Sequence, residues 1–184
     1  MRKLKLQMQT TVDGFVAGPA GQLDWTTPFD QDQPILAFIN QLTDTSDTIL
    51  LGRKMTEGFC GYWESVPTDS PEYSFARKMV DTPKVAFSKT VRTLKGKNLR
   101  VESGDLVGAV TALKKLPGKD LLVYGGAGFV SSLVENDLID ELNLFVNPVA
   151  IGQGLRIFTG RKNLELVRSV HYESGVQVNT YQRR

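Results

Sequence analysis

The sequence predicts an α/β domain with a mainly parallel sheet, helices on both of its faces, and an antiparallel edge. Segments with strand patterns alternate with segments of helical spacing through most of the 184 residues, which is typical of parallel sheets connected by helices. The last part of the chain carries strand patterns only, and these favour a hairpin. The length suits one domain, which we take to be residues 1–184.

In the first half of the chain, residues 4–11 alternate between apolar and polar side chains and predict a strand. The glycine-rich stretch "VDGFVAGPAGQLDW" then predicts a long loop. Residues 34–42 place four apolar side chains on one helical face. The apolar run at 47–51 ("DTILL") predicts a buried strand, and "GRKMTEGF" after it predicts a turn that enters a helix.

The second half continues in the same way. Strands are expected at 83–88, 99–102 and 120–124, and helices at 104–116 and 129–136. Three further strand patterns end the chain, at 138–146, 164–172 and 176–181. The last two are joined at "ESG", which predicts the hairpin.

Bulk properties narrow the class of function. The net charge is +2 and the basic residues are spread along the chain, so we expect neither a nucleic-acid nor a membrane partner. The single cysteine, Cys60, excludes a disulfide within the chain. His171, the only histidine, is far from Cys60 in sequence, so we expect no metal site and no cysteine–histidine nucleophile. We expect a cytoplasmic protein that acts on a small-molecule substrate.

Three loops leave the carboxyl ends of predicted strands, where ligands bind in open parallel sheets. They are "GRKMTE" after "DTILL", "SKT" after "KVAF" and "GGAG" after "LLVY". Gly125, Gly126 and Gly128 would let the backbone approach a ligand closely. The N–H groups of the helix that follows would favour an anion such as a pyrophosphate. Taken alone, this loop is equally consistent with a tight turn that binds nothing.

Cations in the other two loops favour the anion site. Arg53 and Lys54 stand beside Gly52 at the start of a predicted helix, and Lys89 stands between two hydroxyl residues. Positive charge and short donors are how proteins hold a phosphate. The alternative is that these cations are solvated on the surface and bind no phosphate. The glycine spacing excludes an ordinary Rossmann dehydrogenase, and the missing Walker motif excludes a nucleoside triphosphatase.

Taken together, three stretches resemble the dihydrofolate reductase superfamily: "TTVDGFVAGPAGQLDW", "TILLGRKMTE" and "VYGGAGFVSSLVENDLIDELNLFVNPVAIGQG". They are most similar to its RibD C-terminal branch, the riboflavin-biosynthesis reductase domains, and the resemblance covers nearly the whole chain. It implies a dihydrofolate reductase-like fold with a mixed, mainly parallel sheet of eight strands flanked by helices. It also implies NADPH as cofactor and, as in many members of the branch, a homodimer.

The resemblance further implies which residues bind NADPH. The nicotinamide would be bordered by Val16, Ala17 and Gly18. The adenosine-side phosphates would be held by Gly52, Arg53, Lys54 and Met55, and the 2′-phosphate by Ser88 and Lys89 with Phe87 beside them. The pyrophosphate would be cradled by Gly125, Gly126, Ala127, Gly128, Phe129 and Val130. The cations near one ribose favour NADPH over NADH independently of the resemblance.

Candidates for the catalytic residues are Asp24, Trp25 and Asp30. Asp30 follows Trp25 by five residues, a spacing similar to that of the Trp and the pterin-binding acid in dihydrofolate reductases. Asp30 has a second possible role as a helix cap, because Pro34 delays the start of the helix.

These features favour an NADPH-dependent reductase of a small heterocyclic substrate, most like 5-amino-6-(5-phosphoribosylamino)uracil reductase. Such a substrate carries a phosphate, for which the basic candidates are Arg77, Lys78, Arg156 and Arg161. Three alternatives stay open: a dihydrofolate reductase-type activity, a nucleotide-binding domain without catalysis, and a structural dimer unit.

Overall fold

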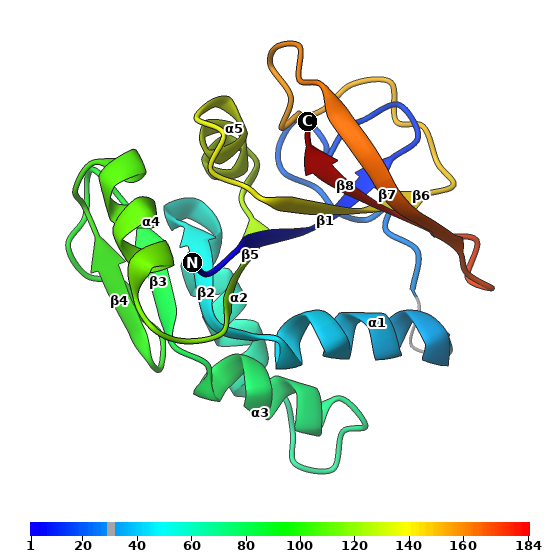
Figure 1. The fold of residues 1–184 in the computed structure, drawn as a ribbon. Coiled ribbons are helices and arrows are strands. Elements are labelled where there is room, and N and C mark those ends of the chain that lie inside the picture. The colour runs from blue at the N-terminus through cyan, green and yellow to red at the C-terminus, as the bar shows by residue number, and fades with distance from the viewer. Residues whose placement is uncertain (29–31) are drawn as a thin grey trace.

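The computed structural model describes residues 1–28 and 32–184. In this part of the chain, eight strands form one sheet in the order β4-β3-β2-β5-β1-β6-β8-β7 (Figure 1). Strands β1 to β6 are parallel, whereas β8 and β7 run antiparallel at one edge. The prediction of a mixed, mainly parallel eight-stranded sheet with a C-terminal hairpin is confirmed.

The elements have the following bounds. The strands are β1 (Leu4–Thr11), β2 (Ser46–Gly52), β3 (Lys84–Phe87), β4 (Leu99–Glu102), β5 (Asp120–Gly125), β6 (Glu141–Asn147), β7 (Leu164–His171) and β8 (Gln177–Arg183). The helices are α1 (Gln33–Asp44), α2 (Arg53–Ser65), α3 (Tyr73–Asp81), α4 (Leu106–Lys115) and α5 (Ala127–Glu135).

Three elements differ from the sequence prediction. Helix α3 was not predicted, because its buried face consists of only three residues, one of them the small Ala76. Helix α5 begins two residues earlier than expected, so Gly128 lies in its first turn. Strand β6 begins at Glu141 and not at residue 138. Asp137 takes a positive φ of 54°, which makes a turn, and Leu138 packs in the main core before the strand begins.

The central parallel strands of the sheet are buried on both faces, as expected for parallel strands. Helices α4 and α5 cover one face, where Leu4, Leu6 and Met8 of β1 meet Leu133 of α5 in the main core. Helices α1, α2 and α3 cover the other face in two smaller clusters. Figure 1 shows α4 and α5 on one side of the sheet and α1 and α3 on the other.

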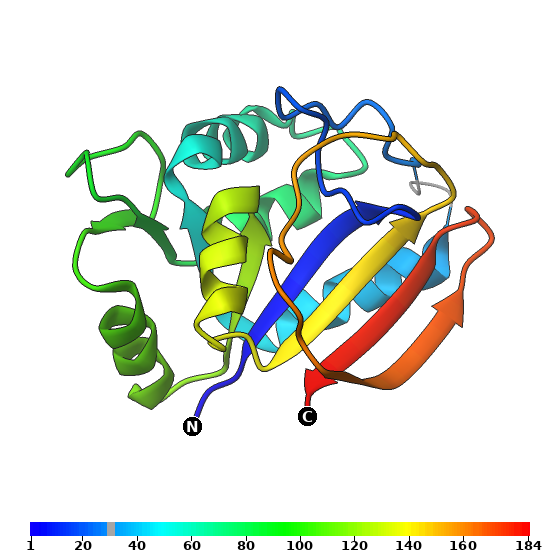
Figure 2. The same ribbon diagram turned by 90° about the horizontal axis from the view of Figure 1, so that it is seen from above.

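Two long segments meet at the carboxyl edge of the sheet. One follows β1 (residues 12–28) and the other follows β6 (residues 148–163), and both lie near the ends of these strands in Figure 2. A short antiparallel bridge joins them: Val16 N–H donates to the Leu155 carbonyl, and Leu155 N–H donates to the Ala17 carbonyl, both at 2.8 Å. The Asp13 carboxylate adds hydrogen bonds from the N–H groups of residues 151 and 152.

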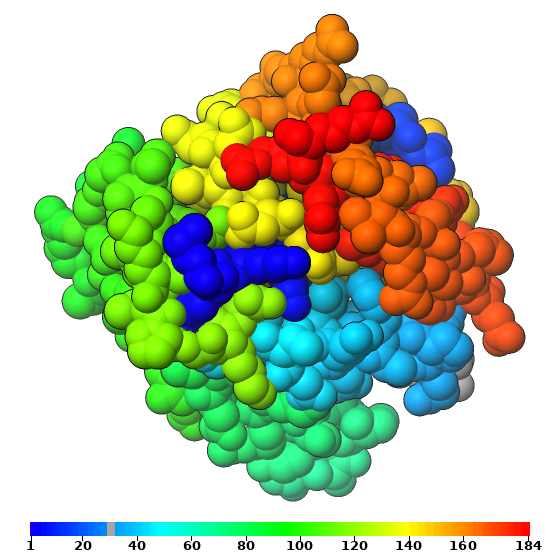
Figure 3. Space-filling view, viewed as in Figure 1, coloured from blue at the N-terminus to red at the C-terminus, as the bar shows by residue number. Residues whose placement is uncertain are grey.

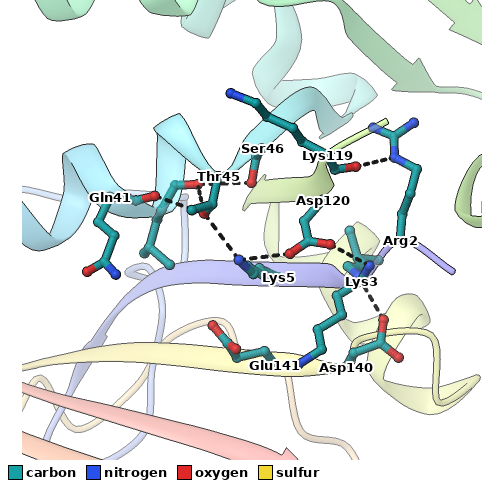
Figure 4. Close-up of polar contacts among 12 residues, drawn as sticks. Arg2, Lys3, Lys5, Gln41, Thr45, Ser46, Lys119, Asp120, Asp140 and Glu141 are labelled. Carbon is teal, nitrogen blue, oxygen red and sulfur yellow. Dashed lines mark hydrogen bonds and ion pairs between the residues drawn. The ribbon is translucent and has the colours of Figure 1, made fainter. Parts of the chain in front are cut away.

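The opposite, amino edge of the sheet is held by charged side chains (Figure 4). Lys5 Nζ lies 2.9 Å from Asp120 Oδ2, and Lys3 N–H donates to Asp120 Oδ1 at 2.8 Å, so that β1 is tied to β5. Asp140 accepts from Leu4 N–H at 2.7 Å and ties β1 to the start of β6.

The surface of the hairpin is open. Strand β7 is at the edge of the sheet, and its Leu166 and Val167 are more than half exposed. Figure 3 shows the C-terminal strands (orange and red) on the surface of one side of the molecule. Among the described residues, no helix has both the length and the apolar character needed to span a membrane.

Candidate functional site

A pocket of about 1030 Å³ opens at the carboxyl edge of the sheet over β1, β2 and β5. Four parts of the chain line it: Gln7–Gln9 with all of residues 16–23 except Gly18 and Gln22, Gly52–Met55, residues 124–129 with Ser131, and Leu155 with Arg156. The volume is at the upper end of the range for ligand sites, and the position is the one at which open α/β sheets bind ligands.

Two helices begin at this pocket without a side-chain cap. The residues before α2 and α5 are Gly52 and Gly126, and neither offers a side-chain acceptor to the first turn. Helices α1 and α4, in contrast, are capped by the carboxylates of Asp32 and Asp105. The free N–H groups and the positive dipole ends of α2 and α5 therefore suit an anion.

Positive side chains reinforce this preference. Arg53 and Lys54 are the first two residues of α2, and both line the pocket. No Asp or Glu is among the described lining residues. The end of the pocket near α2 and α5 can thus hold a phosphate or diphosphate by charge and by backbone N–H groups.

The two glycine loops touch each other. A Cβ built on Gly52 would lie 2.7 Å from the Phe129 Cβ and 3.3 Å from the Gly126 nitrogen, so only glycine is accommodated there. Gly125 has a φ of +144°, which disfavours other residues. The peptide bond between Gly125 and Gly126 is cis.

Gly126 and Gly128 are different, because the protein itself does not require glycine at either position. Neither has a positive φ, and a Cβ on either would meet no atom within 4 Å. Both line the pocket. The space that a side chain would occupy is therefore the space next to the helix N-terminus that a bound phosphate would need. The residues present fit a dinucleotide cofactor.

The third predicted loop lies nearby but outside the pocket lining. The Phe87 ring at the end of β3 stacks on the Phe129 ring, with centroids 5.0 Å apart and planes at 25°. Ser88 is buried, and its hydroxyl accepts from the N–H groups of residues 90 and 91. Lys89 is exposed. The structure thus brings Phe87 against the glycine loop but leaves Ser88 and Lys89 beside the pocket.

Of the other predicted cofactor residues, some line the pocket and some do not. Val16 and Ala17 line the pocket, whereas Gly18 does not and donates its N–H to the Gln22 carbonyl. Val130 is fully buried in the main core, so its side chain stabilises α5 and does not line the pocket.

Two of the three catalytic candidates, Asp24 and Trp25, lie within the described residues. Asp24 is exposed, and Trp25 donates its Nε1–H to the Gln22 carbonyl at 3.2 Å. Neither lines the pocket, although their neighbour Leu23 does. Asp30 lies outside the described residues. The helix cap that was considered for Asp30 is supplied by Asp32, whose carboxylate accepts from Ile35 N–H at 3.2 Å.

The lining residues that were not predicted from the sequence include the polar side chains of Gln7, Gln9 and Tyr124. Gln7 and Gln9 stand at the polar positions of an alternating strand, so nothing in the sequence set them apart before the cover of that face was known. Arg156 was only one of several basic candidates for a substrate phosphate, and the structure places it in the lining. The Arg156 guanidinium lies over the Phe15 ring, 4.0 Å from its centroid, at the rim formed by the bridged segments.

The environment of Tyr124 keeps its hydroxyl protonated. Burial raises the pKa of Tyr124 to about 12, and the contact with Thr43 opposes this only in part. At neutral pH the hydroxyl can therefore donate a hydrogen bond but cannot serve as a base. No group of three or more His, Cys, Asp or Glu residues in the described ranges could hold a metal ion.

Comparison with known sequences identifies similar proteins along nearly the full length. Residues 2–178 match the RibD C-terminal domain family. Two uncharacterized proteins of Bacillus subtilis (strain 168) are related. YyaP is 32% identical over 178 residues, which are 95% of this chain and 92% of YyaP. YwjB is 24% identical over 184 residues, 97% of each chain.

Solved structures share the fold. A Shewanella sp. PV-4 protein provisionally assigned to riboflavin biosynthesis matches with a TM-score of 0.74 and 22% identity, over 100% of this chain and 99% of that one. The Thermotoga maritima deaminase/5-amino-6-(5-phosphoribosylamino)uracil reductase (TM-score 0.68, 14% identity) and Acinetobacter baumannii RibD (0.67, 16%) match all of this chain, which covers 57% and 58% of theirs. The fold is dihydrofolate reductase-like.

Proposed function

The chain belongs to the RibD C-terminal domain family, and from this premise we propose that it is an NADPH-dependent reductase of a small heterocyclic substrate. The family is associated with reductase activity, and the Thermotoga maritima structure is that of a 5-amino-6-(5-phosphoribosylamino)uracil reductase. The reaction of this chain would be of the same type.

One observation carries the proposal: two uncapped helix N-termini and two cations open on the same pocket. Gly52 and Gly126 precede α2 and α5, and Arg53 and Lys54 stand in the first turn of α2. A dinucleotide has a diphosphate to place at such N-termini, and NADPH has a further phosphate for the cations.

When bound, the cofactor supplies a hydride from its nicotinamide ring. The residues of the chain have to bind, orient and shield it, since hydride transfer depends on the donor and acceptor carbons lying about 3–3.5 Å apart. We assign the phosphates to the α2 and α5 end and the nicotinamide to the end lined by Val16 and Ala17. The bridge from these residues to Leu155 fixes that wall of the pocket.

For a phosphorylated substrate, Arg156 is the best placed of the four basic candidates. It lines the pocket, and the other three do not. Lys78 pairs with Asp44 at 2.8 Å, Arg77 pairs with Asp81 at 3.0 Å, and the exposed Arg161 donates its Nε–H to Asn163. We therefore assign the substrate phosphate to the rim at Arg156.

The first test is cofactor binding. We expect NADPH to bind at least tenfold tighter than NADH in a fluorescence titration, because only NADPH carries the extra phosphate. At 100 times its dissociation constant, NADPH should stabilise the fold by about 2.7 kcal/mol. The double variant Arg53→Gln/Lys54→Gln should lose most of the preference, whereas Arg77→Gln, a cation on α3 away from the pocket, should retain it.

Equal affinity for the two cofactors would contradict the assignment of the phosphates. If NADPH neither binds nor stabilises the fold, the reductase and the noncatalytic nucleotide-binding alternatives both fail. Consumption of NADPH with 5-amino-6-(5-phosphoribosylamino)uracil-type substrate or with dihydrofolate then separates a reductase from a binding domain.

We also propose that the chain acts as a homodimer. Strand β7 leaves an edge of the sheet unpaired in the described chain, and its exposed Leu166 and Val167 would be covered in a dimer.

A further inference from the structure

Four neighbouring strands carry a row of uncharged polar side chains on the sheet face that α1 covers. The strand registers pair Gln7 with Asn143 and Asn143 with Thr180 across β1, β6 and β8. Tyr124 on β5 directly follows Val123, the partner of Leu6, and so continues this row. A covered face of a parallel sheet normally carries apolar residues, as this one does around Phe145, whereas β1 places Lys5, Gln7 and Gln9 there. The row therefore needs a reason other than packing.

Most of the row is satisfied within the protein. Thr180 Oγ1 donates to Asn143 Oδ1 at 2.8 Å, and Asn143 Nδ2 donates to Glu141 Oε1 at 3.0 Å. The Tyr124 hydroxyl lies 3.5 Å from Thr43 Oγ1. These contacts leave one member of the row without a partner.

That member is Gln7. Its Oε1 is buried and accepts no hydrogen bond, and none of the described residues bonds to the other end of its amide. A buried polar group without a partner destabilises the fold. Gln7 also lines the pocket, and the terminal torsion of a glutamine turns easily, so a rotated Gln7 amide can form the missing bonds with a molecule bound there.

The next glutamine along β1 shows the contrast. Gln9 also lines the pocket, but its Oε1 accepts from Asn147 Nδ2 at 2.8 Å. Asn147 is itself oriented by Thr27 N–H, which donates to Asn147 Oδ1 at 2.8 Å. The protein thus fixes the orientation of one amide and leaves the other to a ligand.

We propose that Gln7 determines substrate specificity by pairing with an N–H and an adjacent C=O of an uncharged heterocycle. A carboxamide offers one donor and one acceptor side by side in either orientation of its terminal group, so it matches the edge of a cyclic amide. This inference rests on the reductase function proposed above and adds the residue and the part of the substrate ring that it recognises. Sites with such a buried amide discriminate strongly against analogues that leave it unpaired.

The probe for the test is lumazine, whose ring has N–H groups next to carbonyls, and its control is 1,3-dimethyllumazine, which has the carbonyls but no N–H. Both are titrated calorimetrically into the NADP⁺-saturated protein. The variant is Gln7→Met, which keeps the length of the side chain but cannot form the bonds. The matched control is Gln41→Leu, which alters an exposed glutamine on α1.

We expect Gln7→Met to bind lumazine at least tenfold more weakly than the wild type and Gln41→Leu to bind it equally. The affinities of wild type and Gln7→Met for 1,3-dimethyllumazine should agree within twofold, and so should those for NADPH. If Gln7→Met does not fold, Gln7→Asn, which retains a shorter amide, should show the same selective loss for lumazine.

Several results would overturn the inference. These are no lumazine binding by the wild type, equal lumazine affinity of wild type and Gln7→Met, or an equal loss for both probes. A parallel loss of NADPH affinity would place Gln7 against the cofactor and also overturn it. In each of these cases the proposed reductase function is retained as long as the wild type binds NADPH. If the wild type does not bind NADPH at all, the proposed function and the role of Gln7 both fail.

Discussion

At the scale of single residues, the glycines of the pocket fall into two kinds. Gly52 and Gly125 are required by the protein, one by the contact with Phe129 and the other by its positive φ. Gly126 and Gly128 are not required by any contact within the described chain. This difference separates an effect on folding from an effect on binding.

We predict that Gly128→Ala keeps or raises stability but weakens NADPH binding at least tenfold. Alanine in a helix is favoured over glycine by roughly 0.5–1 kcal/mol, whereas the added methyl group would occupy the space of the phosphate. Thermal unfolding and fluorescence titration measure the two effects. The control is Gly58→Ala, at a helical glycine of α2 that also has open space around it. This variant should be more stable than the wild type and bind NADPH with the same affinity. If Gly128→Ala binds NADPH as tightly as the wild type, the assignment of a phosphate to the start of α5 is wrong.

The same scale shows what the sequence could not reveal. The glycine loops and the cations Arg53 and Lys54 were recognisable because their residue types are tied to one kind of chemistry. Gln7 was not, because a glutamine in an alternating strand is ordinary until the helix that covers its face is known. Ser88 and Lys89 form the opposite case: their chemistry suits a phosphate, but the local turn uses the Ser88 hydroxyl.

At the scale of elements, the contacts between β1 and β5 make the amino edge sensitive to pH. Burial alone would raise the pKa of the Asp120 carboxyl, but the Lys3 N–H and the Lys5 ammonium outweigh it and lower the pKa. A lowered folded-state pKa stabilises the fold above the unfolded value of about 3.9. This contribution is lost as the pH falls through the folded-state pKa.

Asp120→Asn should therefore lower the free energy of unfolding by about 1–2 kcal/mol at pH 7. The difference from the wild type should shrink as the pH falls below about 4, where the wild-type carboxyl also becomes neutral. Urea unfolding at pH 7, 5 and 3 measures it. Asp81→Asn, which removes an exposed pair with Arg77, should cost less than about 0.5 kcal/mol. A constant difference at all three pH values would exclude the charge of Asp120 as its source.

Among the elements, the strands could be predicted best. Their apolar or alternating runs are long enough to show the period, and the turn residues between them mark where each strand ends. Helix α3 escaped because nine residues with a small buried face give a weak periodic pattern. The early start of α5 escaped because glycines rarely favour a first turn; here the first turn contains Gly128 and opens on the pocket.

At the scale of the whole molecule, the exposed edge at β7 gives the prediction on assembly. We expect the wild type to have twice the mass of one chain in light scattering. The double variant Leu166→Lys/Val167→Lys should be a monomer, because charges on an edge strand oppose pairing. Leu116→Lys, which changes a leucine of equal exposure (54%) at the end of α4, should remain a dimer. A monomeric wild type would refute the homodimer.

The molecule keeps its tethers and its ligand-facing loops at opposite ends of the same strands. The ion pairs of Lys5 and Asp120 lie where the strands start, and the pocket lies where they finish. The stability of the fold and the substrate specificity consequently depend on separate sets of residues. The segments 12–28 and 148–163 can therefore change to accept a new substrate, by evolution or by design, while the contacts at the amino edge keep the sheet stable.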